Sequence, residues 1–283
     1  MTKKKGYHVH IEANANPMSL NLREVWNYRD LIELYTKRNL TLTYKQTILG
    51  PAWIIINPLI TSVVYMIVFG KLARLSSGGV PQILFYLCGN AFWGFFAACL
   101  TKNAGAFAAN AHIFKKAYFP RLTIPISDAL SAGIQLLIQM ALASIFILFY
   151  LLRGEVHPNW ALFPLLIPTV LVLGIMGASI GILISSITTK YRDLQFLVGF
   201  GLQLWMLASP VVYPLSQITS SRWSFLMQLN PTTAPMEFFR YVILGTGSIT
   251  WVSLLSTLLF VAVASPLSVL IFNRVERTFI DSV

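Results

Sequence analysis

The sequence predicts an all-α integral membrane protein with six transmembrane helices. Of its 283 residues, 56% are hydrophobic and only 11% are charged, whereas about 25% of the residues of a soluble domain are charged. With so few charges, the surface of a soluble fold of this length would be largely apolar, and lipid is the solvent that accepts such a surface. The apolar residues also form runs long enough to cross a membrane, which takes about 20 residues.

Six apolar runs qualify as spans, and short polar segments separate them. In chain order they are Ala52–Leu72, Gln82–Phe107, Thr123–Leu152, Ala161–Ile187, Leu194–Tyr213 and Ile249–Phe272. We therefore divide the chain into a flexible cytoplasmic tail (1–21), an amphipathic surface helix with the approach to the first span (22–50), a six-span domain (51–273) and a second cytoplasmic tail (274–283).

The distribution of Lys and Arg predicts the orientation. With a cytoplasmic N-terminus, the inner segments hold sixteen of the 21 basic residues and the outer segments hold five. This is the positive-inside pattern, so we expect both termini in the cytoplasm. The same pattern accounts for the formal charge of +11 without nucleic acid, which would require basic residues clustered on one polar face. No apolar segment follows the basic N-terminus, so we expect no cleaved signal peptide.

Two segments are predicted to be helical without crossing the membrane. From Leu22 to Tyr35, apolar and charged residues fall on opposite sides of a helix. This pattern is typical of a helix on the membrane surface, or of a soluble helix packed on a partner. Residues 214–247, broken at Asn230-Pro231, are too polar to span but rich in aromatic residues. Because backbone at membrane depth must be helical or buried in protein, they predict short re-entrant or interfacial helices.

No catalytic, metal-binding or phosphate-binding motif stands out, so energy for uphill transport would come from another chain or an ion gradient. The acidic residue inside a predicted span is Asp128. It is either an interfacial or capping carboxylate near Arg121 or a proton relay. Gln135 and Gln139 lie one turn apart, and their amides either join helices through hydrogen bonds or line a path for a polar substrate.

Aromatic residues make up 13% of the chain and gather near the predicted outer ends of the spans. An interfacial aromatic belt explains this pattern, and so do rings that stack on the faces of sugars. The candidate path residues are Tyr86, Asn90, Trp93, Phe96, Gln135, Gln139, Gln203, Trp205 and Tyr213.

Five short motifs together resemble one family. The run from Tyr44 to Trp53, with Pro58 after it, resembles the approach to the first span in permeases of polysaccharide-exporting type-2 ABC transporters, which export O-antigen, capsule or teichoic acid chains. The Tyr-Lys-Gln-Thr start is most similar to the O-antigen permeases. The resemblance extends from Leu22 to the C-terminus, and its further motifs are 113–121, Tyr191-Arg192-Asp193, 209–214 and Leu229-Asn230-Pro231.

The resemblance implies partners and roles. Two copies of this chain would assemble with two cytoplasmic ATPase subunits, which would bind ATP and Mg²⁺, and no cofactor or metal is expected in this chain. Segment 108–121 would couple to the ATPase, and segment 214–247 would form an outer lid. The implied coupling residues are His112, Lys115, Lys116, Phe119, Arg121, Arg192 and Asp193, and the implied lid residues are Pro214, Asn230, Pro231, Phe239 and Arg240.

The expected function is the export of a lipid-linked, O-antigen-like polysaccharide from the cytoplasm across the bacterial inner membrane. Basic residues of the surface helix would attract the pyrophosphate of the lipid, over a range that salt limits to about 8 Å. Capsule or teichoic acid export, export of a drug or small lipid, and a membrane enzyme or assembly factor without transport remain as alternatives. The expected head-group residues are Arg23, Arg29, Lys37 and Arg38.

Overall fold

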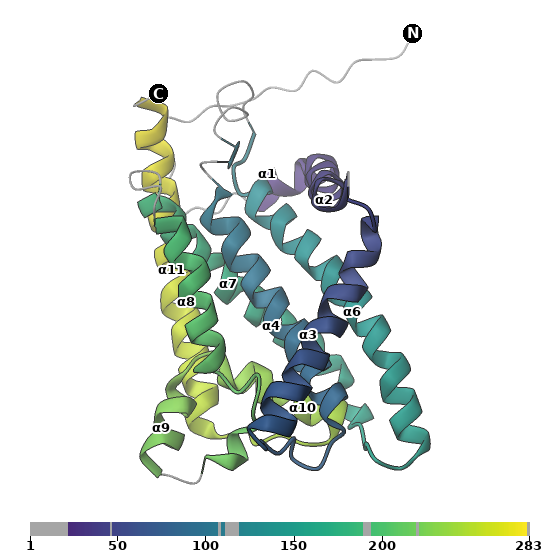
Figure 1. Ribbon diagram of the computed structural model, residues 1–283. Helices are drawn as coiled ribbons and strands as arrows, with labels where there is room; N and C mark the ends of the chain where they lie inside the picture. Colours follow the sequence, from purple (N-terminus) through teal and green to yellow (C-terminus); the bar gives the residue numbers. More distant parts are fainter. Residues whose placement is uncertain are drawn as a thin grey trace.

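The computed structural model describes residues 22–45, 47–106, 109–110, 119–188, 194–218 and 221–281. These residues are predominantly helical, and no strand occurs among them. Figure 1 shows the long helices running side by side, with α1 and α2 at one end of the bundle and α9 and α10 at the other. We call these the α2 end and the α10 end.

Five helical segments are long and apolar enough to cross a membrane, and they coincide with five of the six predicted spans. The first joins η1 (Gly50–Ala52), α3 (Trp53–Tyr65) and η2 (Met66–Leu72). The others are α4 (Gln82–Ala104), α6 (Thr123–Leu152), η3 (Trp160–Leu165) continued by α7 (Leu166–Thr188), and α11 (Trp251–Asp281).

The predicted span Leu194–Tyr213 is shorter than expected. Its helix, α8 (Leu194–Leu207), has 14 residues, so the described chain offers five full-length crossings and one shorter apolar helix. Pro210 explains the early end. Proline has no N–H to donate to the preceding turn and disfavours helical geometry in the residue before it. At the other extreme, α11 continues past Phe272 to Asp281, into the segment predicted as a tail.

α4 is the central helix of the bundle. In its most apolar stretch 72% of the residues are buried, compared with 11% for α6. A helix that is apolar on all sides belongs in a core, and α4 supplies most of the large buried side chains, among them Tyr86, Phe92 and Phe96. The peripheral helices instead expose long rows of Leu, Ile and Val, as expected of surfaces that face lipid or a partner chain.

Two glycines bring α7 close to α4. A Cβ atom on Gly177 would lie 2.8 Å from the carbonyl oxygen of Phe96 and 3.0 Å from the Cβ of Cys99. A Cβ on Gly181 would collide with the carbonyl oxygen of Leu100. Glycines four residues apart present one smooth helix face, which lets two backbones approach closely within a membrane.

The predicted surface helix is two helices, α1 (Leu22–Asn27) and α2 (Arg29–Tyr44), separated at Tyr28. Ile32 and Tyr35, from the apolar side of the pattern, are buried against the chain's own bundle. Trp26, which the same pattern placed on the packed side, is 69% exposed. The break at Tyr28 explains the difference, because the two helices do not share one continuous face.

The segment predicted as two short helices broken at Asn230-Pro231 contains α9 (Ser221–Leu229) and α10 (Thr233–Leu244), preceded by η4 (Leu215–Gln217). α10 ends at Gly245, whose φ of +73° is the left-handed conformation that glycine adopts at helix ends. Helices α9 and α10 thus lie across the end of the bundle (Figure 1).

Candidate functional site

At the α2 end, polar side chains join α2 to the first turns of α6. Asn39 donates a hydrogen bond from Nδ2 to Oδ1 of Asp128 at 2.7 Å. The Thr36 hydroxyl bonds the Ile32 carbonyl in its own helix at 2.8 Å, and it also lies 3.5 Å from the carbonyl oxygen of Ser127. Asp128 therefore anchors the surface helix to a transmembrane helix.

α4 contributes to the same contact. Lys102 donates from Nζ to the Ser131 hydroxyl at 2.7 Å, and that hydroxyl donates to the backbone carbonyl of Asp128 at 2.8 Å. Three helices therefore meet around one carboxylate, with a lysine close by. This arrangement satisfies the polar groups in a largely apolar setting, which is the usual requirement for burying them.

Contacts from α2 also reach both edges of the predicted coupling segment. Arg38 donates from Nη2 to Oδ1 of Asn110 at 3.3 Å, and its guanidinium lies 4.6 Å from the ring centre of Tyr35. Tyr35 in turn packs on Phe119, with ring centroids 6.1 Å apart. α2 therefore touches the chain immediately before and after residues 111–118.

Two of the seven predicted coupling residues, Phe119 and Arg121, lie within the described ranges. Phe119 and Arg121 are both buried, and each has interaction partners. The predicted coupling residues that lie outside the described ranges are His112, Lys115, Lys116, Arg192 and Asp193.

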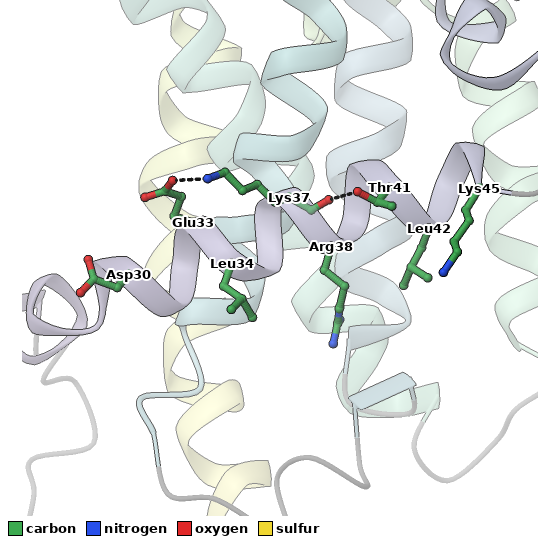
Figure 2. Close-up of a pocket in the computed structure, with 8 residues that line it drawn as sticks. All are labelled: Asp30, Glu33, Leu34, Lys37, Arg38, Thr41, Leu42 and Lys45. Atoms are coloured by element: carbon green, nitrogen blue, oxygen red, sulfur yellow. Dashed lines mark hydrogen bonds and ion pairs between the residues drawn. The ribbon is translucent and has the colours of Figure 1, made fainter.

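The predicted head-group residues differ in their solvent exposure and in their interaction partners. Arg23, Arg29 and Lys37 are exposed, and Arg38 is half-buried. Lys37 donates to the carboxylate of Glu33 at 2.6 Å, and this hydrogen bond, together with the lysine charge, lowers the pKa of Glu33. Figure 2 shows the pair on α2, and both residues line a hollow of about 610 Å³.

At the α10 end, the central contact is a buried ion pair within α10. Arg240 lies 3.1 Å from Glu237, one turn earlier, and their side chains are 2% and 1% exposed. Arg240 also donates from Nη2 to the carbonyl of Val211 at 2.6 Å, and its guanidinium lies 4.0 Å from the ring centre of Phe85. Both charges are therefore removed from solvent and compensated by neighbours, as a buried pair requires.

Glu237 extends this contact to two further segments. Its carboxylate accepts hydrogen bonds from the backbone N–H groups of Leu215 at 3.3 Å and Ser248 at 2.8 Å. The Glu237–Arg240 pair thereby fastens α10 to the chain that follows α8 and to the chain that precedes α11.

A second polar cluster surrounds the break between α9 and α10. Asn230 accepts from the indole N–H of Trp205 at 3.0 Å and donates to the carbonyl of Ala208 at 2.7 Å and the Ser209 hydroxyl at 3.0 Å. The hydroxyls of Ser209 and Thr232 are 2.8 Å apart. Asn230 thus ties the break to the C-terminal end of α8.

The predicted lid residues all lie in this region. Phe239 stacks on Phe92 of α4 with ring centroids 4.1 Å apart. The carbonyl of Pro231 accepts a hydrogen bond from Thr257 of α11 at 2.7 Å, and Pro214 is buried. The segment is therefore packed onto α4, α8 and α11 rather than projecting from the bundle.

The predicted path residues fall into two groups. Tyr86, Trp93 and Phe96 are buried in α4, and Phe96 packs against Trp205 with ring centroids 5.2 Å apart. The other path residues are half-buried or exposed: Asn90, Gln135, Gln139, Gln203 and Tyr213. Within the described chain, none of the side-chain amides among them has a hydrogen-bond partner.

Three residues central to these contacts were not selected from the sequence. Asn39 and Asn110 sit in segments whose neutral polar residues carry no distinctive pattern. Glu237 carried a usable signal, because it is an acid three residues before Arg240 in a predominantly apolar stretch, the spacing of an ion pair along one helix face.

Comparisons with known proteins show which family the chain resembles over most of its length. A family model described as ABC-2 type transporter matches residues 30–244. Two proteins from Klebsiella pneumoniae named O-antigen export system permease protein RfbA are 27% identical over 269 and 267 residues, covering 93% of this chain and 99% of each relative. One of the same name from Myxococcus xanthus is 28% identical over 224 residues, covering 78% of this chain and 83% of that relative. Since the family model covers most of the chain and both ends of the helical bundle, this chain belongs to the ABC-2 type transporter family.

Proposed function

We propose that this chain is the permease subunit of an ATP-driven exporter that moves a lipid-linked, O-antigen-like polysaccharide from the cytoplasm across the bacterial inner membrane. The observation that carries the proposal is the similarity, over nearly the whole chain, to permeases named for O-antigen export. Family membership implies an ATPase subunit in the same transporter, and we propose a dimer of this chain with two such subunits, which bind ATP and Mg²⁺.

The proposed topology has six crossings with both termini in the cytoplasm. The α2 end is then the cytoplasmic end and the α10 end is the outer one, as the excess of Lys and Arg requires. α8 is about 21 Å long, and we propose that it crosses with the help of the chain after it. Val211 and Val212 of that chain are buried against the bundle, which is where non-helical backbone is tolerated at membrane depth.

The proposed coupling route runs through α2. Because α2 contacts both Asn110 and Phe119, a push on residues 111–118 by the ATPase would be transmitted to α2. The Asn39–Asp128 hydrogen bond would then transmit the movement of α2 to α6. Exposed Arg23, Arg29 and Lys37, with half-buried Arg38, would hold the pyrophosphate of the lipid near this point.

The proposed path lies between two copies of the chain. Gln135, Gln139 and Gln203 have no hydrogen-bond partners within the described chain, and their amides suit the hydroxyls of a sugar. Phe96 joins such a path only when α8 moves, because Trp205 covers it. We propose that residues 214–247 close the outer end, with Asn230 holding the closed position through Trp205.

A deletion strain tests the function. We expect it to lose surface polysaccharide and to accumulate lipid-linked polysaccharide in the cytoplasm, and a plasmid copy of the wild-type chain should reverse both effects. Normal surface polysaccharide in the deletion strain would overturn the proposal.

Charge reversal tests the coupling assignment. The double substitution Lys115→Glu and Lys116→Glu should abolish export while the chain still inserts and dimerises. The matched control, Lys4→Glu with Lys5→Glu, makes the same change of charge in the N-terminal tail and should export normally. Unchanged export by the Lys115/Lys116 variant would refute the coupling role.

A further inference from the structure

Two hollows meet on α2, and Thr41 and Lys45 line both of them. The first, of about 610 Å³, follows one side of α2. Figure 2 shows Leu34, Arg38 and Leu42 extending in the same direction as Lys45 along this side. The full lining is polar and charged apart from two leucines: Asp30, Glu33, Leu34, Lys37, Arg38, Thr41, Leu42 and Lys45.

The second hollow is an apolar groove of about 370 Å³, a volume within the usual range of ligand pockets, roughly 300–1,000 Å³. It lies between the C-terminal end of α2, the start of the first transmembrane helix and α6. Pro51, Ile54, Ile134 and Ile138 form its apolar wall, and Leu40, Thr41, Tyr44 and Lys45 complete it. A polar hollow thus joins an apolar groove, which is the arrangement that an amphiphile requires.

Lys45 is the uncommitted cation at this junction. Lys37 is paired with Glu33, and Arg38 bonds Asn110 and lies over Tyr35. Lys45 is exposed, and none of the carboxylates in the described part of the chain lies within ion-pair distance of it. One free ammonium group next to a hydroxyl matches a single negative charge.

We infer that the groove binds an anionic phospholipid of the cytoplasmic leaflet, with one acyl chain against Ile134 and Ile138 and the phosphodiester on Lys45 and Thr41. A phosphodiester carries one negative charge, as Lys45 can neutralise. A diphosphate, which carries more charge, would need a second cation in the groove itself, and among the described residues that line it Lys45 is the one cation. Tyr44 is half-buried beside the groove, where burial raises the pKa of its phenol, so it remains a neutral donor.

This lipid is distinct from the transported one. The inference goes beyond the proposed function, because a phospholipid bound here would fill the groove between α2 and α6 whatever substrate the transporter carries. Its test measures binding and requires no transport.

Native mass spectrometry of the purified transporter complex tests the inference. Bound lipid is compared after incubation with phosphatidylglycerol or with phosphatidylcholine of the same acyl chains. We expect wild type to retain phosphatidylglycerol preferentially, and Lys45→Gln to reduce its retention about fivefold, as expected for one basic residue near anionic lipid. Lys71→Gln, an exposed lysine at the α10 end, should retain the wild-type amount.

A second variant tests the groove itself. Ile138→Trp should fill it and reduce retention of both lipids, whereas Leu148→Trp, on an exposed part of α6 near its other end, should not. Equal retention of phosphatidylglycerol by Lys45→Gln and wild type would overturn the inference. Displacement of phosphatidylglycerol by an equal concentration of a polyprenyl diphosphate would overturn the assignment to a phospholipid.

Discussion

Each end of the bundle carries an ion pair one helical turn apart, and the two pairs differ mainly in burial. At the α2 end, Lys37 and Glu33 are 2.6 Å apart with side chains 74% and 64% exposed. At the α10 end, Arg240 and Glu237 are 3.1 Å apart with side chains 2% and 1% exposed. The shorter pair is the weaker restraint, because water competes for both of its partners and salt screens it.

The difference extends to the surroundings of each pair. The Glu237–Arg240 pair bonds backbone groups of three residues in two other chain segments, so its loss would release α10 from both of them. The Lys37–Glu33 pair contacts α2 alone, and α2 is held to the bundle through single hydrogen bonds of Thr36, Arg38 and Asn39 and through the packing of Tyr35. The α10 end is therefore the more firmly held end, and opening it would take a larger force than shifting α2 at the other end.

The largest expected effect follows from breaking the buried pair. Glu237→Ala leaves Arg240 buried without its counter-charge, so we expect a loss of about 3–5 kcal/mol in the free energy of unfolding in detergent. Replacing both residues, with Glu237→Leu and Arg240→Met, should recover part of this loss because no unpaired charge remains. Glu33→Ala at the exposed pair should leave the thermal midpoint unchanged; a comparable loss there would invalidate the contrast between the ends.

A smaller loss is expected at the break between α9 and α10. Asn230→Ala removes the hydrogen bonds to the half-buried Trp205 indole and the Ser209 hydroxyl, each worth about 1 kcal/mol. Thermal unfolding followed by Trp fluorescence measures the loss. Gln228→Ala, which removes a hydrogen bond inside α9 only, is the control and should shift the midpoint much less.

At the α2 end, the expected effect is local. Asn39→Ala removes the hydrogen bond to Asp128, worth about 1 kcal/mol, so α2 should detach more often while the bundle stays folded. Hydrogen exchange should quicken in α2 and remain unchanged in α10. Faster exchange throughout the protein would show that α2 is part of the global folding unit.

The smallest expected effect is a pH response of the exposed pair. The lysine lowers the pKa of Glu33 below its ordinary value of 4.5, so the pair's contribution is complete above that value. It is lost as the pH falls through the lowered pKa. A carboxylate titration followed by infrared spectroscopy should show Lys37→Gln restoring the pKa of Glu33 toward its ordinary value; no change would mean that the pair does not form in solution.

The long helices could be predicted because lipid imposes a simple condition on each of them: enough apolar residues in a row. The five full-length crossings begin and end within a few residues of the predicted boundaries. The two short helices around Asn230-Pro231 were predictable from proline chemistry. The end of α8 at Leu207 was missed because apolar composition continues to Tyr213, whereas helical hydrogen bonding stops before Pro210.

The contacts between segments could not be predicted in the same way. Asn39 and Asp128 are separated by 89 residues, and composition does not show which polar residues meet. The apolar residues on every side of α4 indicate a core helix, but the close approach of α7 to Phe96 at Gly177 depends on a residue far away in the sequence.

The length of α6 has a consequence for the membrane around it. Its 30 residues extend about 45 Å, whereas the hydrocarbon region is about 30 Å thick. The contact with α2 lies at Asp128, within the first two turns, and residues 131–152 are by themselves long enough to cross. The length of α6 therefore determines how far α2 lies from the acyl chains. In thicker membranes Asp128 is drawn toward the hydrocarbon, where its hydrogen bond to Asn39 strengthens as water is excluded. Bilayer thickness thus becomes one determinant of how firmly α2 is docked.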